Sequence, residues 1–457
     1  MRIVVIGSGP GGYSAAIRSS QLGAEVFLIE KEYLGGICLN KGCIPSKVLL
    51  HVAQTYESFK KTKGFGISLD SPPRCDFKKV IEHKNKIVER LRIGMESQLK
   101  KQGTHFVNGI AKIATPNLIY VDTSNGGPEI IETDKIIIAS GSEDLTLPVI
   151  NLAEERILTA TEVFNLSEIP ENVIILGAGP VGVEFACLFN ALGAEVSLIE
   201  LLPQVLPQED AELARAFQRV LELRGIRVFN GTRVERVDCG PECVTAHLSS
   251  EINIVGGVLI SCIGRKPHLT GLGLENVDVL IEREAILVNE MMETTAPGIY
   301  AVGDVVGKAM VAHIASVEGL VAAENASGEG KAVDYSVIPS CVYSFPEIAS
   351  VGIAKEKAEE LGYKVKVAKS SFLTSGKAHI LGETNGFIQI IVDKETHKIL
   401  GCQIMGYGAT EIIHEAALAI RLGATAKDLA NLIHAHPTFS ESYMEAARNI
   451  YGKGIYS

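Results

Sequence analysis

The sequence predicts an α/β protein made of several domains. Three observations lead to this fold class. The chain has 457 residues, which is more than one hydrophobic core normally organises. A glycine-rich stretch at residues 7–30 recurs without gaps at residues 177–200, which indicates a duplicated unit. From about residue 336, short alternating segments precede helical stretches at residues 409–422 and 440–451, so we expect a separate C-terminal α+β domain.

The first thirty residues have the pattern of a strand, a tight turn, a helix and a second strand. An apolar strand at residues 2–6 leads into GSGPGG, and a helix-forming stretch separates it from a strand that ends at Glu30. Gly7 permits the tight turn, Gly9 lets backbone N–H groups approach a pyrophosphate, and Gly12 lets helix and strand pack closely. Glu30 is placed to accept hydrogen bonds from ribose hydroxyls. This pattern predicts a Rossmann-like dinucleotide-binding domain.

The second copy makes a chance match improbable. GAGPVGVEFACLFNALGAEVSLIE aligns with GSGPGGYSAAIRSSQLGAEVFLIE, and Gly177, Gly179 and Gly182 repeat the glycine positions after the strand NVIIL. Glu200 would accept from a free ribose 2′-hydroxyl but repel a 2′-phosphate, and the following LLPQV contains no Arg or Lys. We therefore expect two dinucleotides, with NAD rather than NADP at the second site. The alternative, that Glu200 is only a solvated strand end, stays open here.

Further strand-and-turn segments indicate that the second copy is inserted into the first domain. These are IIIASGS at residues 136–142, SCIGRKP at 261–267 and GIYAVGD at 298–304. We expect the first domain to cover residues 1–142 and to be completed by residues 268–335. The inserted domain then covers residues 143–267, and the C-terminal domain covers residues 336–457.

Cys38 and Cys43 lie five positions apart in GGICLNKGCIPSK. They are candidates for inert buried thiols, metal ligands or a redox couple. A structural zinc site needs four ligands and no second thiol pair is near, so we expect no metal. The apolar spacing of residues 45–59 predicts a helix, whose N-terminus lowers the pKa of a thiol at Cys43. Lys47 adds positive charge in the same turn, so we interpret the pair as reactive.

Composition and charge narrow the class of function. The net charge of -11 argues against a nucleic-acid or anionic-membrane partner. The chain opens with a strand rather than a charged leader, and it has no uncharged apolar run of ~18 residues, so we expect a cytoplasmic protein without membrane spans. Nine cysteines, an odd number, do not suggest a secreted disulfide framework. Cys239 and Cys243, in DCGPEC, are expected to lie in a loop.

Taken together, these motifs resemble the class I pyridine nucleotide-disulfide oxidoreductases. The resemblance covers essentially the whole chain through the two fingerprints, GGICLNKGCIPSK, GIYAVGD and HAHPTFSES, in family order. It implies a redox-active disulfide between Cys38 and Cys43, FAD at the first site and NAD(P)H at the second. It also implies a C-terminal dimerisation domain and a homodimer whose active sites are shared between subunits.

The resemblance also implies which residues contact the cofactors. Lys47 would lie beside the flavin and pair with Glu184, because a buried lysine needs a partner. The implied FAD residues are Gly7, Gly9, Gly12, Glu30, Lys47, Ser140, Gly141, Ser142, Asp304, Met310, Val311, Ala312 and His313. The implied NAD residues are Gly177, Gly179, Val181, Gly182, Glu184, Glu200, Val234 and Gly264.

The segment HAHPTFSE supplies a candidate base. A histidine has an unperturbed pKa of about 6.5, so it can take a thiol proton at neutral pH and return it. The resemblance implies His436 as the base, oriented by Glu441. By sequence alone His434 is an equal candidate, and both histidines could be structural.

Within the family, HAHPTFSE is similar to the version found in dihydrolipoamide dehydrogenases. The implied activity is reoxidation of protein-bound dihydrolipoamide through the disulfide and FAD, with reduction of NAD+ to NADH. Cys38 would be the sulfur that substrate attacks, and Cys43 would face the flavin. The implied partners are lipoyl domains of 2-oxo acid dehydrogenase or glycine cleavage complexes. Two alternatives stay open: an NAD(P)H-dependent reductase of another disulfide, and a non-catalytic nucleotide-binding redox sensor.

Overall fold

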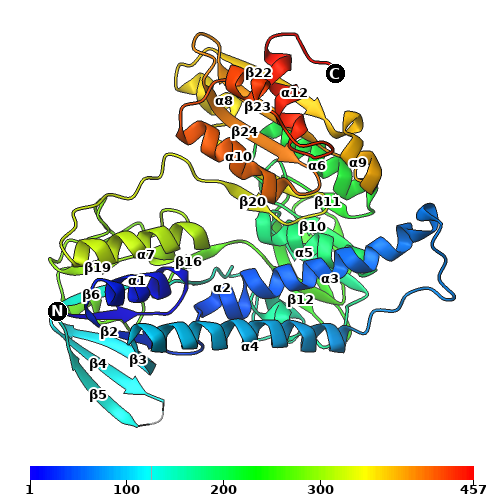
Figure 1. Ribbon diagram of the computed structural model, residues 1–457. Coiled ribbons are helices and arrows are strands. Elements are labelled where there is room, and N and C mark those ends of the chain that lie inside the picture. Colours follow the sequence, from blue (N-terminus) through cyan, green and yellow to red (C-terminus); the bar gives the residue numbers. More distant parts are fainter. Residues whose placement is uncertain (125, 457) are drawn as a thin grey trace.

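The computed structural model describes residues 1–124 and 126–456, which form three bodies (Figure 1). Two of them are α/β units and the third is a C-terminal α+β unit, which stands above the others in Figure 1. The second α/β unit is inserted between strands of the first, because β19 returns to the first sheet after the strands of the second sheet have been completed. The fold class predicted from the sequence is therefore confirmed.

The first unit contains a seven-stranded sheet. Five neighbouring strands are parallel, and the strands β3, β4 and β5 continue the sheet as an antiparallel extension that the sequence did not reveal. In spatial order the strands are β19 (Ile299–Ala301), β6 (Lys135–Ile138), β1 (Arg2–Ile6), β2 (Glu25–Glu30), β3 (His105–Thr115), β4 (Leu118–Thr123) and β5 (Gly127–Glu132). Helices α1 (Pro10–Gln21) and α7 (Ala312–Ala326) pack side by side against this sheet (Figure 1).

The second unit repeats this plan with a five-stranded parallel sheet. Its spatial order is β11 (Arg227–Phe229), β10 (Glu195–Ile199), β9 (Asn172–Leu176), β15 (Val258–Ser261) and β8 (Ile157–Thr159). Its helices are α5 (Pro180–Ala191) and α6 (Ala211–Leu223). A smaller antiparallel sheet adds β12 (Val234–Cys239), β13 (Val244–Leu248) and β14 (Asn253–Gly256).

The duplicated glycine turns have the same geometry in both units. Gly7 has φ +99°, and a Cβ there would lie 2.2 Å from the carbonyl oxygen of Ala139. Gly177 has φ +98°, and a Cβ would lie 2.5 Å from the carbonyl oxygen of Cys262. Both the conformation and the close approach exclude a side chain, so the glycines are required where the strand turns into the helix.

Two structural connections fix the inserted unit against the first. One is an antiparallel ribbon of β7 (Ser142–Asp144) and β16 (Arg265–Pro267). The other is formed by α2 (Gly36–Lys41), α3 (Cys43–Lys61) and α4 (Phe77–Gln102), which extend across toward the second unit in Figure 1. Leu49 and Leu50 of α3 share one hydrophobic core with Phe185 and Leu188 of α5. Helix α3, which begins with Cys43, is thereby packed directly against the second unit.

The C-terminal unit is a five-stranded antiparallel sheet with helices, as the sequence predicts. The strand order is β20 (Ser340–Val342), β21 (Ile348–Gly352), β24 (Ile399–Met405), β23 (Phe387–Asp393) and β22 (Val365–Ser371). The helices are α8 (Lys355–Glu360), α9 (Gly376–Leu381), α10 (Ala409–Arg421), α11 (Ala426–Asn431) and α12 (Glu441–Ile450). The remaining short elements are η1 (Thr62–Phe65), η2 (Glu162–Asn165), η3 (Leu274–Asn276), η4 (Gly303–Val306), η5 (Phe372–Thr374), β17 (Ile281–Glu282) and β18 (Ala285–Ile286).

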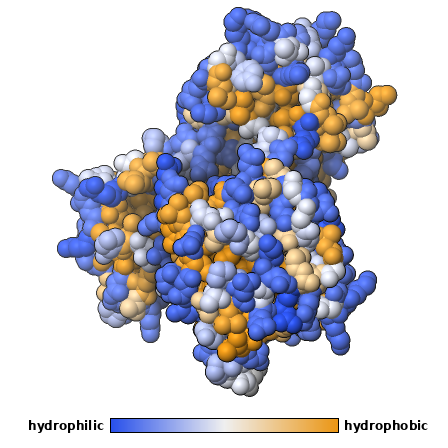
Figure 2. All heavy atoms as spheres, turned by 90° about the vertical axis from the view of Figure 1, so that its left-hand side faces the viewer, coloured by the Kyte–Doolittle hydropathy of each residue, from blue (hydrophilic) through white to orange (hydrophobic). Residues whose placement is uncertain are grey.

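Apolar side chains remain exposed on the surface of the C-terminal unit. Figure 2 shows such side chains on this upper body and over a broad area of the body below it. The most exposed examples in the C-terminal unit are Ile433, at 93%, and Leu422, at 74%. Large exposed apolar areas commonly mark interaction surfaces. Separately, none of the helices in the described residues is long and apolar enough to cross a membrane.

Candidate active site

The two thiols predicted to be reactive lie together at a cavity of about 580 Å³. Cys38 is on α2 and Cys43 is the first residue of α3, as expected for a thiol at a helix N-terminus. The thiol of Cys38 hydrogen-bonds to that of Cys43. The two sulfur atoms are therefore close neighbours at the start of α3.

The two thiols have opposite acidities. The hydrogen bond from Cys38 lowers the pKa of the Cys43 thiol to about 7 against the opposing effect of burial, and the charge of Lys47 acts in the same direction. The same hydrogen bond and burial raise the pKa of Cys38. Cys43 is thus the sulfur that carries negative charge near neutral pH, while Cys38 keeps its proton and donates it to the hydrogen bond.

Lys47 and Glu184 form the pair that the family resemblance implied. The Nζ atom of Lys47 lies 2.8 Å from Oε2 and 3.0 Å from Oε1 of Glu184, whose side chain is only 6% exposed. The backbone N–H of Tyr343 donates to Glu184 Oε1 at 3.0 Å, and the Lys47 ammonium lies 4.6 Å from the centre of the Tyr343 ring. The C-terminal unit thereby closes this part of the site. No sequence motif marks Tyr343.

The cavity extends from the thiols to the glycine turn of the first unit. Gly7 and Gly9 line it at the start of α1, and Glu30 lines it at the end of β2. Glu30 is buried, and its Oε2 accepts from the backbone N–H of Ser8 at 2.9 Å and from the Ser8 hydroxyl at 2.7 Å. A carboxylate has further lone pairs, so Glu30 keeps acceptor capacity for a ribose. Other predicted FAD residues that line the cavity are Lys47, Ser140, Gly141, Ser142, Asp304, Met310 and Ala312.

Three of the predicted FAD residues do not line the described cavity. Val311 and His313 have exposed side chains, although their neighbours Met310 and Ala312 line the cavity. Gly12 is buried beneath the turn, where a Cβ would lie 1.9 Å from the carbonyl oxygen of Gly7. Its contribution is therefore to helix packing, as predicted, rather than to a direct contact.

In the second unit, Glu200 occupies the position that corresponds to Glu30. It is buried, its Oε2 accepts from the N–H of Ala178 at 2.6 Å, and its Oε1 accepts from the N–H of Leu202 at 2.9 Å. The alternative of a solvated strand end is therefore wrong. Of the other predicted NAD residues, Val181, Glu184 and Gly264 line the cavity, whereas Val234 is buried in the core at the start of β12. Gly177, Gly179 and Gly182 form the glycine turn and the first turn of α5.

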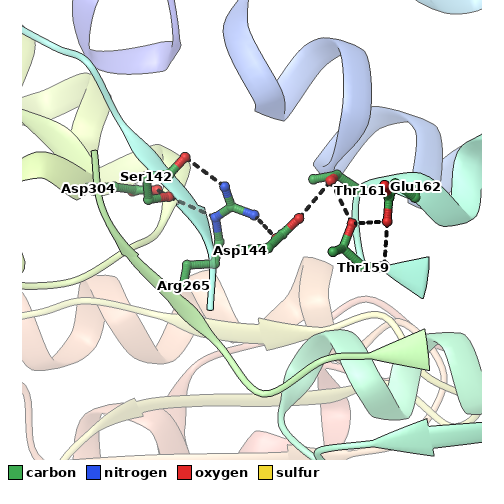
Figure 3. A network of polar contacts seen from close by, with 7 residues as sticks. All are labelled: Ser142, Asp144, Thr159, Thr161, Glu162, Arg265 and Asp304. Carbon is green, nitrogen blue, oxygen red and sulfur yellow. Dashed lines mark hydrogen bonds and ion pairs between the residues drawn. The ribbon is translucent and has the colours of Figure 1, made fainter. Parts of the chain in front are cut away.

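A polar network joins the two α/β units at the cavity (Figure 3). The Ser142 hydroxyl donates to Asp304 Oδ2 at 2.5 Å, and Arg265 Nε donates to Ser142 Oγ at 2.7 Å. Arg265 also forms an ion pair with Asp144, and the Thr161 hydroxyl donates to Asp144 Oδ2 at 2.6 Å. The network therefore runs from η4 through the β7 and β16 ribbon into the second unit. Sequence reasoning missed Arg265, Asp144 and Thr161, although Arg265 follows directly after the strand-and-turn SCIG.

The two C-terminal histidines differ sharply in exposure. His434 has a side chain only 5% exposed and hydrogen-bonds through Nε2 to Glu415 at 2.8 Å. His436 has a side chain 78% exposed, and its Nδ1 lies 2.9 Å from Glu441 Oε1. Burial alone would raise the pKa of Glu441, but hydrogen bonds from the Thr438 N–H and from His436 hold it below its usual range. His436 is therefore the histidine that is free to act on another molecule.

His436 does not belong to the described lining of the cavity formed by its own chain. Its exposed Nε2 points away from the carboxylate that binds Nδ1, so Glu441 fixes the ring and leaves one nitrogen free. An exposed, oriented histidine outside the cavity agrees with the expectation of a site completed by a second subunit.

The other close cysteine pair has a simpler environment. Cys239 ends β12 and pairs with Val244, while the Gly240 N–H donates to the Cys243 carbonyl oxygen at 2.8 Å. Cys243 thus lies in the turn of the β12–β13 hairpin, as expected, but the prediction of a loop is wrong for Cys239, which is the last residue of β12. Cys239 is partly buried against a hydrophobic core, whereas Cys243 is exposed.

Comparison with known proteins agrees with this geometry. The sequence model of the pyridine nucleotide-disulphide oxidoreductases matches residues 1–319, and that of their dimerisation domain matches residues 338–447. The chain belongs to the pyridine nucleotide-disulphide oxidoreductases. As a member of this family it is an oxidoreductase with FAD and NAD as cofactors, and its C-terminal unit is a dimerisation domain.

Individual relatives in the family cover almost the whole chain. The chain is 41% identical to a protein from Thermus scotoductus named dihydrolipoyl dehydrogenase, over 99% of this chain and 98% of that protein. It is 39% identical to a protein from Vigna unguiculata named leghemoglobin reductase, over 99% of this chain and 88% of that protein. Its fold resembles the crystal structure of LpdA from Mycobacterium tuberculosis, with a TM-score of 0.92, 26% identity, and 98% and 99% of the two chains covered.

The residues that line the cavity of this family member fit FAD. A buried acid for a ribose, Glu30, lines the cavity, and the N-terminus of α1 provides free N–H groups for a pyrophosphate. The thiol of Cys43 and the ammonium of Lys47 also line the cavity, where a redox-active ring would meet them. Among the described residues, no group of three or more His, Cys, Asp and Glu side chains is placed to hold a metal ion.

Proposed function

We propose that the protein oxidises dihydrolipoamide, the reaction of a dihydrolipoamide dehydrogenase, with NAD+ as the electron acceptor. The observation that carries this proposal is the hydrogen-bonded pair of Cys38 and Cys43, which lines the FAD cavity beside Lys47 and Glu184. A dithiol–disulfide couple in this position accepts two electrons from a dithiol substrate on one side and passes them to a flavin on the other. The close similarity to dihydrolipoyl dehydrogenases favours this substrate.

The reaction begins with the oxidised disulfide form of the pair. His436 of the partner subunit, held by the partner's Glu441, takes the proton from one thiol of the substrate. The resulting thiolate attacks Cys38 and forms a mixed disulfide, while Cys43 leaves as a thiolate. Cys43 leaves as the thiolate because the positive charge of Lys47 stabilises it.

The second thiol of the substrate completes the oxidation. Its thiolate attacks the substrate sulfur bound to Cys38, which releases cyclic lipoamide and leaves both cysteines reduced. Cys38 takes up the proton that the second substrate thiol loses, and donates it in the hydrogen bond to the Cys43 thiolate. Lys47, fixed by Glu184, keeps its positive charge beside that thiolate. The chemistry that bound FAD supplies is the transfer of these two electrons to NAD+.

The proposal of NAD rather than NADP rests on Glu200. Its carboxylate is fixed by two backbone N–H groups, so it cannot swing away from an approaching ligand without losing both hydrogen bonds. A 2′-phosphate placed there would meet a buried negative charge at close range.

Other aspects of the function stay predictions from the sequence. We propose lipoyl domains of 2-oxo acid dehydrogenase or glycine cleavage complexes as partners, a homodimer as the active form, and a cytoplasmic location. The principal alternative is an NAD(P)H-dependent reductase that acts on another disulfide. A redox sensor without turnover is the third possibility.

Cysteine variants separate these functions. Steady-state oxidation of dihydrolipoamide by NAD+ is measured for the wild-type protein and for Cys38→Ser and Cys43→Ser. We expect turnover in the wild type and its loss in both variants, with Cys243→Ser as a control that keeps full activity. Turnover that survives in Cys38→Ser would refute the proposed relay. An inactive wild type that still binds FAD would favour another substrate or a sensor.

A further inference from the structure

Glu318 on α7 is completely buried and lies directly behind the flavin cavity. Its side chain is 0% exposed, its Oε2 accepts from the backbone N–H of Gly303 at 2.7 Å, and its Oε1 accepts from the hydroxyl of Tyr335 at 2.7 Å. Each oxygen accepts from a donor, so both hydrogen bonds stabilise the ionised carboxylate. Nothing in the reaction described above uses this carboxylate.

The hydrogen bond to Gly303 fixes the turn that presents Asp304 to the cavity. Gly303 begins η4 with φ +77°, and the next residue, Asp304, lines the cavity and accepts the hydroxyl of Ser142 at 2.5 Å. The N–H of Gly303 points into the protein, and a buried backbone N–H needs a hydrogen-bond acceptor. Glu318 is the group that satisfies that N–H, so the position of Asp304 depends on it.

The charge on Glu318 is only weakly compensated. Within the described part of the chain it forms no ion pair, and the titratable groups that act on it are Tyr335, Lys308 and Asp304. Burial raises the pKa of Glu318, the hydrogen bonds from Tyr335 and Gly303 and the charge of Lys308 oppose this, and Asp304 adds to it. The carboxylate of Glu318 therefore lies behind that of Asp304, which lines the cavity.

Tyr335 holds Glu318 from the segment that leads into the dimerisation domain. Its hydroxyl also lies 3.8 Å from the sulfur of the buried Met292, and the ammonium of Lys308 lies 5.1 Å from its ring centre. Glu318 is consequently fixed from both sides, by a backbone turn at the cavity and by a side chain behind it. A carboxylate held in this way cannot rotate away when charge develops in the cavity.

We propose that Glu318 is a positioning residue of the FAD site that also sets the reduction potential of the bound flavin. It holds the Gly303–Asp304 turn in place, and its buried negative charge opposes the accumulation of electrons on the cofactor. This inference rests on the proposed placement of FAD along Asp304. A carboxylate behind the site lowers the potential because reduced flavin gains negative charge, and the protein interior screens that repulsion poorly.

Two substitutions separate the positioning role from the charge. Glu318→Gln keeps the shape: its Oε1 accepts from the Gly303 N–H, and its amide donates to Tyr335, whose hydroxyl also accepts. Glu318→Ala removes the support of the turn altogether. Glu324→Gln is the matched control, because Glu324 lies on the same helix, pairs with Arg18 and Lys331, and does not line the cavity.

The readouts are the dissociation constant of FAD, from the fluorescence of released flavin, and the midpoint potential of the bound flavin. We expect Glu318→Gln to raise the potential while FAD binds within about threefold of the wild type. We expect Glu318→Ala to weaken FAD binding by about tenfold or more, as loss of a hydrogen bond to a charged group does. Glu324→Gln is expected to change neither quantity.

The outcomes distinguish this inference from the proposed function. An unchanged potential in Glu318→Gln would overturn the role of the charge, and wild-type FAD affinity in Glu318→Ala would overturn the positioning role. Should Glu318→Ala fail to fold, Glu318→Gln still tests the charge through the potential. A wild-type protein that binds no FAD would refute the proposed site itself, before either variant is compared.

Discussion

Replacing Cys38 with alanine tests the origin of the acidity of Cys43. The hydrogen bond from Cys38 is the largest influence that lowers the pKa of Cys43 from its ordinary value of 9.0 to about 7. At pH 7 this makes about half of the Cys43 population thiolate, whereas a thiol at the ordinary value is ionised in only about one molecule in a hundred. In Cys38→Ala we therefore expect the thiolate fraction at pH 7 to fall by about fiftyfold. Burial, which raises the pKa of Cys43, and the charge of Lys47, which lowers it, then act against each other.

The assay is the rate of alkylation of Cys43 by iodoacetamide as a function of pH. The protein is reduced and freed of FAD so that the cavity is open, and the labelled peptides are resolved by mass spectrometry. We expect the midpoint of the pH dependence of the alkylation rate to lie near pH 7 in the wild type and well above pH 7 in Cys38→Ala. Cys38→Ser, which keeps an O–H donor, should lie between them. Cys243, exposed and outside the cavity, serves as the internal reference for the reagent. Wild-type behaviour of Cys43 in Cys38→Ala would refute this explanation of its acidity.

Three further predictions concern the base, the buried ion pair and the choice of nucleotide. His436→Ala should lower kcat/KM for dihydrolipoamide by about 10²–10⁴-fold. Its melting temperature should be unchanged because the side chain is exposed, and Glu441→Gln should lower kcat/KM by a smaller factor. Full activity of His436→Ala would exclude this base. Glu184→Leu should lower the free energy of unfolding in urea by about 1–3 kcal/mol, because it leaves the partly exposed Lys47 without its partner, and unchanged stability would contradict the importance of the pair. Glu200→Gln keeps the side-chain shape and should raise kcat/KM for NADPH relative to NADH by about tenfold, while an unchanged ratio would show that Glu200 does not select the nucleotide.

Much of the fold could be predicted because its signals are local. The glycine turn, the strand before it and the acid at the end of the next strand all fall within residues 7–30, and the second copy repeats them. The backbone pairing of β1 with β2 and of β9 with β10 follows from this unit. By contrast, β4 and β5 carry no such motif, and their place at the edge of the sheet depends on β3, which continues from the parallel part into the antiparallel part.

The parts of the site that escaped prediction are contacts between residues far apart in the chain. Tyr343 donates to Glu184 across 159 positions, and its arrival depends on how the dimerisation domain docks on α5. Glu318 on α7 accepts from the N–H of Gly303, which lies 15 positions earlier in η4, and nothing in the sequence of the helix indicated this partner. The Lys47–Glu184 pair was expected only through the family resemblance, because the spacing of the two residues in the sequence does not indicate that they meet.

The most direct test of the proposed function is a comparison of substrates with the purified protein. NADH oxidation is followed with lipoamide, and in parallel with glutathione disulfide, and both measurements are repeated with NADPH. The combination of NADH and lipoamide is expected to be turned over far faster than the other three. A yellow protein that prefers NADPH, or that reduces glutathione disulfide faster than lipoamide, would contradict the assignment of dihydrolipoamide and NAD+ as substrates.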